Sequence, residues 1–249
     1  MSTRGHGANV AVLVHGGTLT STMWDPVRSR LAAPSIAVDL PGRRYKPADL
    51  ASLTISDWVT SVVADIDEAG LTDVVLVGHS SGGYVLPGVA AALAADTAPA
   101  LHGLVFVSAT VPAHGERPLD YLREDIRTLA RDHRELTLDS ARGCTIGGLR
   151  SGEPPIETDL KIVENGPRMG LEAPLVLFER VSWAGFPTDV PRVYVRGLRD
   201  KVIPPELADR MVAAMGGAKV IDLDAGHRSY ETNPAELAAV IDECCGIAL

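Results

Sequence analysis

The sequence predicts an α/β fold in which a mostly parallel, doubly wound sheet carries a helical cap. Three observations predict it. Short apolar runs bounded by Gly, Pro or Asp recur along the chain, helical segments lie between most of them, and one long stretch interrupts this alternation. Runs that are apolar at nearly every position suit strands buried on both faces, as in a parallel sheet covered by helices on both sides.

Six of these runs predict strands, and four segments between them predict helices. The expected strands are Val10–Val14, Ile36–Asp39, Val74–Val77, Leu104–Ser108, Val193–Arg196 and Lys219–Asp222. The expected helices are Ser56–Ala69, Ser81–Ala95, Pro204–Met215 and Asn233–Cys244. Ser56 is the expected N-cap of the first helix, and Pro87 is expected to kink the second.

The alternation stops between residues 110 and 183, where the sequence shows charged helical patches, loop-like segments and a further apolar helical segment but no convincing strand. A connection of about 70 residues is too long for a plain loop in a compact domain. We therefore expect residues 110–183 to form a helical cap inserted into a core made of residues 1–109 and 184–249.

Composition excludes several classes of protein. With 249 residues, 46% of them hydrophobic and 22% charged, the chain can bury the core of one globular domain. A formal net charge of −9, no basic run and 4% aromatic residues argue against nucleic-acid binding. No apolar stretch approaches the roughly 20 residues that span a bilayer, and the first apolar run is too short for a signal peptide. We expect no nucleic-acid or membrane partner and a cytoplasmic location, and nothing in the sequence indicates the oligomeric state.

The cysteines indicate neither disulfides nor a metal site. There are three, and two of them, Cys244 and Cys245, are adjacent. This arrangement provides no disulfide framework and no Cys-x-x-Cys spacing. The sequence therefore predicts neither a metal nor another cofactor.

The strongest functional signal is the pentapeptide Gly78-His-Ser80-Ser81-Gly82, which follows a predicted strand and opens a predicted helix. A serine on such a sharp strand-to-helix turn presents an exposed hydroxyl, and glycines two residues to either side avoid collisions with neighbouring backbone. The central Ser80 is the predicted nucleophile, whereas Ser81 would contribute a backbone N–H. The alternative is a plain tight turn.

A nucleophilic serine needs a base and a carboxylate that orients the base. His227 follows the last predicted strand, so it would lie at the same sheet edge as Ser80. Asp200 follows the preceding strand and is the predicted carboxylate, with a helix-capping role as its alternative. Asp222 and Asp224 are too close to His227 along the chain to approach the far nitrogen of its ring.

The segment His15-Gly16-Gly17 follows the first strand at the same edge and predicts an oxyanion hole. We expect the N–H of Gly17 and the N–H of Ser81 to face the substrate oxygen. His15 and His79 are predicted to be structural. The possible pocket walls are Leu19, Val85, Met169, Leu177 and Trp183.

Together these residues resemble the α/β-hydrolase superfamily, over nearly the whole chain outside the cap. The chain looks most like the esterase/hydroxynitrile-lyase branch, which includes plant methyl esterases. The similar blocks are Val12-Leu-Val-His-Gly-Gly, Val77-Gly-His-Ser-Ser-Gly-Gly, Leu104-Val-Phe-Val-Ser-Ala-Thr-Val-Pro, Asp200-Lys-Val-Ile-Pro-Pro-Glu and Gly226-His227. The resemblance implies an α/β-hydrolase fold, a Ser80, Asp200 and His227 triad, and an oxyanion hole at Gly17 and Ser81.

Departures from the family pattern indicate the reaction. The lyases of this branch carry Thr and Lys where this chain has Gly16 and Arg228, which favours hydrolysis of a small or medium carboxylic ester. Ser80 argues against the dehalogenases and epoxide hydrolases of this fold, whose nucleophile is Asp. The alternatives are C–C bond cleavage, lactone opening or acyl transfer at the same site, or a ligand-binding protein with negligible turnover.

Overall fold

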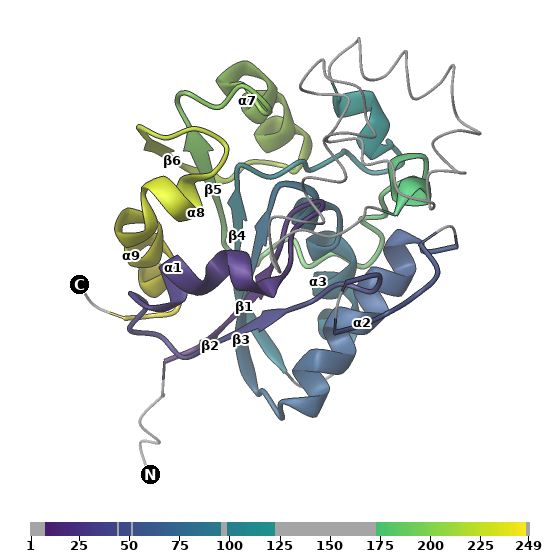
Figure 1. The fold of residues 1–249 in the computed structure, drawn as a ribbon, viewed down its shortest axis with the longest axis horizontal. Coiled ribbons are helices and arrows are strands. Elements are labelled where there is room, and N and C mark those ends of the chain that lie inside the picture. The colour runs from purple at the N-terminus through teal and green to yellow at the C-terminus, as the bar shows by residue number, and fades with distance from the viewer. Residues whose placement is uncertain (1–7, 44, 51, 96–98, 123–172, 248–249) are drawn as a thin grey trace, which may run out of the picture.

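The computed structural model describes residues 8–43, 45–50, 52–95, 99–122 and 173–247, and these residues contain one six-stranded sheet. Its strand order is β2-β1-β3-β4-β5-β6, and every neighbouring pair is parallel (Figure 1). The strands are β1 (Val10–Val14), β2 (Ser35–Val38), β3 (Asp73–His79), β4 (Ala100–Val107), β5 (Arg192–Gly197) and β6 (Lys219–Leu223). All six predicted strands are confirmed: β1 has the predicted ends, and the other five differ from the prediction at one or both ends.

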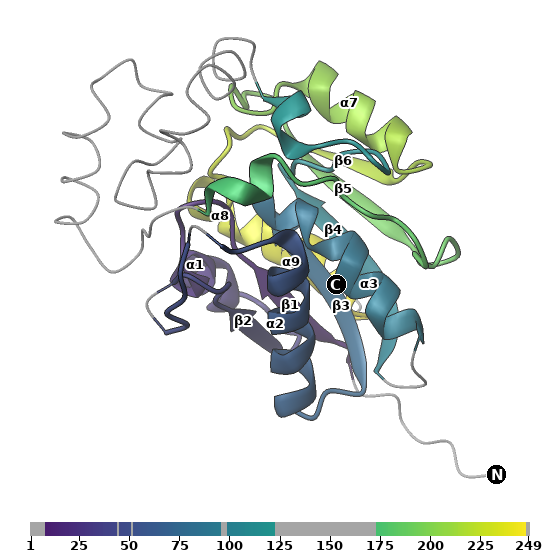
Figure 2. The same ribbon diagram turned by 90° about the vertical axis from the view of Figure 1, so that its right-hand side faces the viewer.

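Helices cover both faces of this sheet. They are α1 (Asp25–Arg28), α2 (Ile55–Glu68), α3 (Leu86–Ala95), α7 (Pro205–Ala214), α8 (Ser229–Thr232) and α9 (Pro234–Cys244). Turning the molecule by 90° brings α2 and α3 in front of the sheet, with α1 and α9 behind it (Figure 2). The predicted doubly wound α/β arrangement is therefore confirmed for the part of the chain that the structure describes.

Two hydrophobic clusters, one on each face of the sheet, explain this layering. Along β1, Val12 and Val14 belong to the cluster that α2, α3 and α7 complete, whereas Ala11 and Leu13 belong to the cluster beneath α1 and α9. Successive residues of a strand point to opposite faces, so a strand between two helical layers must be apolar at every position. This requirement is the pattern that made the strands predictable.

Two details of the helices differ from the sequence-based expectation. Helix α2 begins one residue earlier than expected, and its N-cap is Thr54 rather than Ser56. The reason is Asp57, three residues beyond Thr54, since the two residues exchange side-chain and backbone hydrogen bonds in a capping box. The predicted helix 81–95 is divided into the 3-10 helix η2 (Ser80–Tyr84) and α3, so Pro87 lies in the first turn of α3, where proline is tolerated.

The described ends of the predicted cap form two short 3-10 helices. These are η3 (Pro118–Tyr121) after β4 and η6 (Pro174–Leu177) before β5. The small apolar cluster of Leu119 and Leu177 joins them. Residues 123–172, where most of the expected cap falls, lie outside the described residues, so the division of the chain into core and cap stays a prediction.

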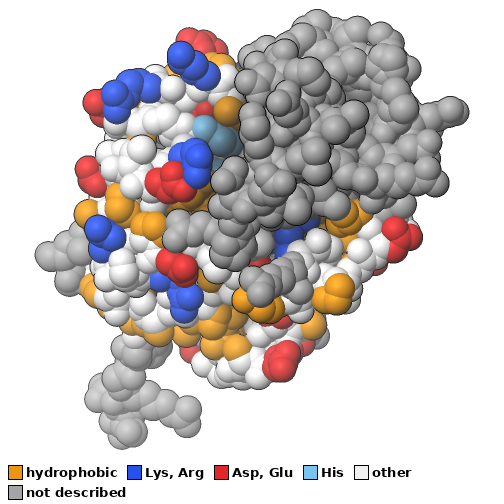
Figure 3. Space-filling model, in the orientation of Figure 1, with side chains coloured by type: hydrophobic (Ala, Val, Ile, Leu, Met, Phe, Trp, Pro, Cys, Tyr) orange, Lys and Arg blue, Asp and Glu red, His pale blue; other side chains and the backbone are white. Residues whose placement is uncertain are grey.

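On the face shown in Figure 3, Lys and Arg side chains lie close to Asp and Glu side chains in small separate groups. The ion pairs of the described residues include Arg196 with Asp222 and Lys219 with Glu243. Among the described helices, none is both long and apolar enough to cross a membrane.

Candidate active site

The pentapeptide Gly78-His-Ser80-Ser81-Gly82, called the nucleophile elbow, forms a tight turn where β3 ends and η2 begins. Ser80 has a φ of 51°, a left-handed conformation that costs a residue with a side chain of order 1–3 kcal/mol. The N–H of Thr110 donates to the carbonyl of Ser80 at 2.9 Å and thereby supports this turn. A Cβ at Gly82 would lie 2.9 Å from the backbone oxygen of Val14, so only glycine fits there.

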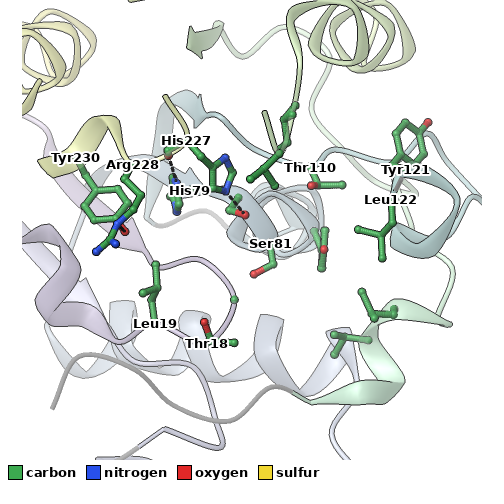
Figure 4. A pocket seen from close by; sticks show the side chains of 17 residues that line it. Thr18, Leu19, His79, Ser81, Thr110, Tyr121, Leu122, His227, Arg228 and Tyr230 are labelled. Atoms are coloured by element: carbon green, nitrogen blue, oxygen red, sulfur yellow. Dashed lines mark hydrogen bonds between the residues drawn. The ribbon is translucent and has the colours of Figure 1, made fainter. Parts of the chain in front are cut away.

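The structure brings Ser80, His227 and Asp200 together at the carboxyl edge of the sheet. His227 follows β6, and its Nε2 lies 3.0 Å from Ser80 Oγ. Its Nδ1 lies 2.8 Å from Asp200 Oδ2, and Asp200 lies in the turn after β5. Figure 4 shows the His227 ring pointing toward the elbow, with a dashed line for its hydrogen bond to Ser80. The three residues thus form one hydrogen-bonded chain.

The carboxyl group of Asp200 is buried and fully engaged. Its Oδ1 accepts the N–H groups of Val202 at 2.7 Å and Ile203 at 2.9 Å, while Oδ2 faces His227. Burial alone would raise the pKa of Asp200, but the hydrogen bond and charge of His227, with the two backbone N–H groups, outweigh it and lower that pKa. The carboxyl group therefore stays ionised next to the imidazole.

The rival carboxylates point elsewhere. Asp222 forms an ion pair with Arg196 at 2.7 Å, and Asp224 forms one with Arg199 at 2.9 Å. The Arg199–Asp224 pair is largely exposed to solvent, whereas in the other pair Asp222 is 43% exposed and Arg196 only 19%. Of these three aspartates, only Asp200 contacts His227 in the structure.

The loop after β1 supplies the other side of the site. His15 is fully buried, donates from Nδ1 to the carbonyl of Gly16 and accepts the N–H of Leu40 at Nε2. Burial lowers the pKa of His15 to about 3, so it is a neutral structural residue. Gly17 lines the same cavity as Ser81, whose N–H lies in the first turn of η2, where helical N–H groups lack an intrahelical acceptor.

A cavity of about 200 Å³ lies against these residues. Of the predicted walls, Leu19 and Leu177 line it. Val85 instead has no exposed surface and packs in the hydrophobic core directly before α3. Trp183, which donates from Nε1 to the carbonyl of Pro112, is not among the described lining residues. Met169 lies outside the described residues.

The sequence interpretation missed most of the cavity wall. The additional lining residues are Thr18, His79, Tyr84, Thr110, Tyr121, Leu122, Val176, Val202, Ile203, Arg228 and Tyr230. Figure 4 shows Tyr121 and Leu122 on one side of the cavity and Arg228 and Tyr230 on the other. Val202, Ile203, Arg228 and Tyr230 could have been found, because they lie within three residues of Asp200 or His227 along the chain.

The described residues contain no group of three or more His, Cys, Asp or Glu side chains that could hold a metal ion. Cys244 is half-buried and Cys245 is buried, both as free thiols in α9 or just after it.

Comparison with known proteins identifies the family. The sequence model of the alpha/beta hydrolase family matches residues 11–240. Methylesterase 17 of Arabidopsis thaliana is 24% identical to this chain, over 92% of the chain and 89% of the relative. The lipase LipV of Mycobacterium tuberculosis is 29% identical, over 92% of the chain and 90% of the relative.

The solved structures agree in fold. An extracellular alpha/beta-hydrolase from a Paenibacillus species superposes with a TM-score of 0.72 at 19% sequence identity, covering 95% of this chain and 98% of that chain. This chain therefore belongs to the alpha/beta hydrolase family. It is an enzyme of the esterase-like branch of that family.

Proposed function

We propose that this protein hydrolyses a small or medium carboxylic ester through an acyl-enzyme formed on Ser80. The observation that carries the proposal is the continuous hydrogen-bonded chain from Ser80 Oγ through His227 to the buried Asp200. Relatives named as a methylesterase and a lipase, similar over most of their length, support an ester as the substrate. The cavity of about 200 Å³ has room for a compact substrate.

In the first half of the reaction, Ser80 Oγ attacks the ester carbonyl while His227 Nε2 takes the hydroxyl proton. Asp200 holds the ring with Nδ1 protonated and stabilises the imidazolium that forms. The oxyanion accepts hydrogen bonds from the N–H groups of Gly17 and Ser81. His227 then gives its proton to the alkoxide oxygen, the carbon–oxygen bond breaks, and the alcohol leaves.

In the second half, water replaces the alcohol. His227 takes a proton from the water as it attacks the acyl carbonyl, the same oxyanion hole holds the second tetrahedral intermediate, and His227 returns the proton to Ser80 Oγ as the acid leaves. No redox partner is needed, because the reaction consumes one ester and one water and yields one acid and one alcohol.

The test replaces each of two adjacent serines by alanine and compares how fast the variants hydrolyse p-nitrophenyl esters of increasing acyl length. Ser80→Ala should fold but release no nitrophenol above background. Ser81→Ala should keep turning over, because the proposed contribution of Ser81 is its backbone N–H and its buried hydroxyl has no partner among the described residues. Undiminished turnover in Ser80→Ala contradicts the proposal.

Product analysis on lactones, β-diketones and acyl acceptors separates ester hydrolysis from lactone opening, C–C cleavage and acyl transfer at the same site. Tight ligand binding without any turnover would instead favour a binding protein. The expected cytoplasmic location stays a prediction.

A further inference from the structure

His79, the residue before Ser80, is buried and makes one directed polar contact. Its Nε2 lies 2.9 Å from the backbone oxygen of His227, and only 1% of the residue is exposed. A carbonyl oxygen only accepts hydrogen bonds, so Nε2 must carry the proton and Nδ1 must be bare. Burial lowers the pKa of His79 to about 3, which keeps the ring a neutral donor.

Three aromatic rings surround the imidazole of His79 and fix its orientation. Its centroid lies 6.4 Å from the ring of Trp24 and 4.9 Å from that of Tyr230, both in edge-on arrangements. The ring of His227 itself is 4.9 Å away. Because these rings leave the His79 imidazole little freedom to move, its N–H can in turn hold the His227 carbonyl in place.

The opposite edge of the ring packs against the loop that carries Gly17. A Cβ at Gly16 would lie 2.6 Å from His79 Nδ1 and 3.0 Å from Ser80 Cβ. The backbone of this loop therefore approaches the ring as closely as a glycine allows. One imidazole thus touches the loop after β1, the elbow after β3 and the loop after β6.

We propose that His79 is a positioning residue, which sets the place of the His227 main chain relative to Ser80 through its hydrogen bond to the His227 carbonyl. Figure 4 shows this bond as a dashed line between the ring of His79 and the main chain of His227, and His79 also lines the cavity. Without the donor, the carbonyl is left unsatisfied and its peptide is free to rotate toward another partner. This inference rests on the proposed function, because it concerns how fast Ser80 attacks the ester.

A shift of the His227 main chain would affect catalysis, because the His227 imidazole must stay aligned with Ser80 Oγ, 3.0 Å away. A misplacement of about 1 Å in such a constellation costs roughly 100-fold in rate. Substrate binding does not depend on this alignment, so kcat should fall while KM changes little.

The test uses His79→Gln and His79→Met, which have side chains of similar length and both lack the aromatic ring. The amide nitrogen of Gln can take the place of Nε2 and donate to the His227 carbonyl, whereas Met cannot donate. We expect kcat for a p-nitrophenyl ester to fall about 10- to 100-fold in His79→Met and less than about 5-fold in His79→Gln. His102→Met is the control, because His102 lies toward the start of β4 and contacts Asp73.

Equal values of kcat in the Gln and Met variants would overturn the proposal, because the loss would then follow the ring and not the hydrogen bond. If His79→Met fails to fold, His79→Gln decides alone. A wild-type melting temperature with less than about 5-fold loss of kcat supports the proposal, and a larger loss overturns it.

A second readout needs no turnover. The proton between His227 Nδ1 and Asp200 should give a low-field proton resonance in the wild type and in His79→Gln, and that resonance should broaden or vanish in His79→Met. Its persistence in His79→Met overturns the positioning role. If no ester is hydrolysed but the resonance changes as expected, the proposed function fails and the positioning role stands.

Discussion

Replacing Asp200 by Asn should leave the fold intact and almost abolish turnover, for a reason visible in the hydrogen bonds of Asp200. Oδ1 accepts two backbone N–H groups, at 2.7 and 2.9 Å, and Oδ2 faces His227 Nδ1 at 2.8 Å. An asparagine must keep its carbonyl oxygen toward the two N–H groups, because an NH₂ group there would face two donors. Its NH₂ group is therefore directed at His227.

This orientation forces the wrong tautomer on the imidazole. An NH₂ group can only donate to Nδ1, so the proton of the neutral ring moves to Nε2, which then cannot take the proton of Ser80. The matching substitution in the Ser-His-Asp template lowers kcat about 10⁴-fold, which corresponds to roughly 5 kcal/mol of activation free energy. Both backbone hydrogen bonds survive, so the melting temperature should change by less than about 4 °C.

The assay is steady-state hydrolysis of a p-nitrophenyl ester, with the melting temperature measured on the same samples. Asp222→Asn is the matched control, since Asp222 pairs with Arg196 on the surface and should affect neither KM nor kcat. An Asp200→Asn variant that keeps more than about a tenth of wild-type kcat would refute the tautomer argument.

Three further outcomes follow from the same contacts. Gly82→Ala should lower the free energy of unfolding by about 1–3 kcal/mol, because the added Cβ would lie 2.9 Å from a backbone oxygen of β1. Gly103→Ala is the control: its Cβ would meet nothing closer than 3.7 Å, so the same thermal melt should show little change. Tyr194→Phe removes the hydroxyl that donates to the buried carbonyl of Ala109, 2.7 Å away. The melting temperature should fall by roughly 2–4 °C for each kcal/mol of stability that the lost hydrogen bond costs, with kcat unchanged. An unchanged melting temperature would contradict this prediction. Because the pKa of Asp200 lies below its ordinary 3.8, its stabilising effect is complete above that value and is lost as the pH falls through the lowered pKa. Below about pH 4, the melting temperature of Asp200→Asn should therefore decrease less steeply with falling pH than that of the wild type. Equal slopes of melting temperature against pH in the two proteins would contradict this prediction.

The strands and the meeting of Ser80, His227 and Asp200 could be predicted because each depends on a strong constraint. Strands between two helical layers must be apolar throughout, and β3, β5 and β6 run parallel, so their carboxyl ends share one edge. Residues that follow those ends are then close in space, however distant in sequence. Asp200 and His227 are 2.8 Å apart for this reason.

The cavity wall could not be predicted in the same way, because it depends on where single side chains point. Val85 is as apolar as Val202, yet Val85 packs in the hydrophobic core and Val202 lines the cavity. Hydrophobicity alone does not distinguish these two environments. His79 shows the same limit, since its position before Ser80 predicts a structural role but not its hydrogen bond to the His227 carbonyl, 148 residues away.

The nucleophile is tested most directly by finding which residue a serine-reactive phosphonate modifies. The folded protein is labelled first and is then digested and analysed by mass spectrometry. We expect a single adduct on Ser80, which forms rapidly in the wild type, is absent in Ser80→Ala and forms much more slowly in His227→Gln. An adduct on Ser81 or another residue, or labelling of Ser80 at an unchanged rate in His227→Gln, would contradict this expectation.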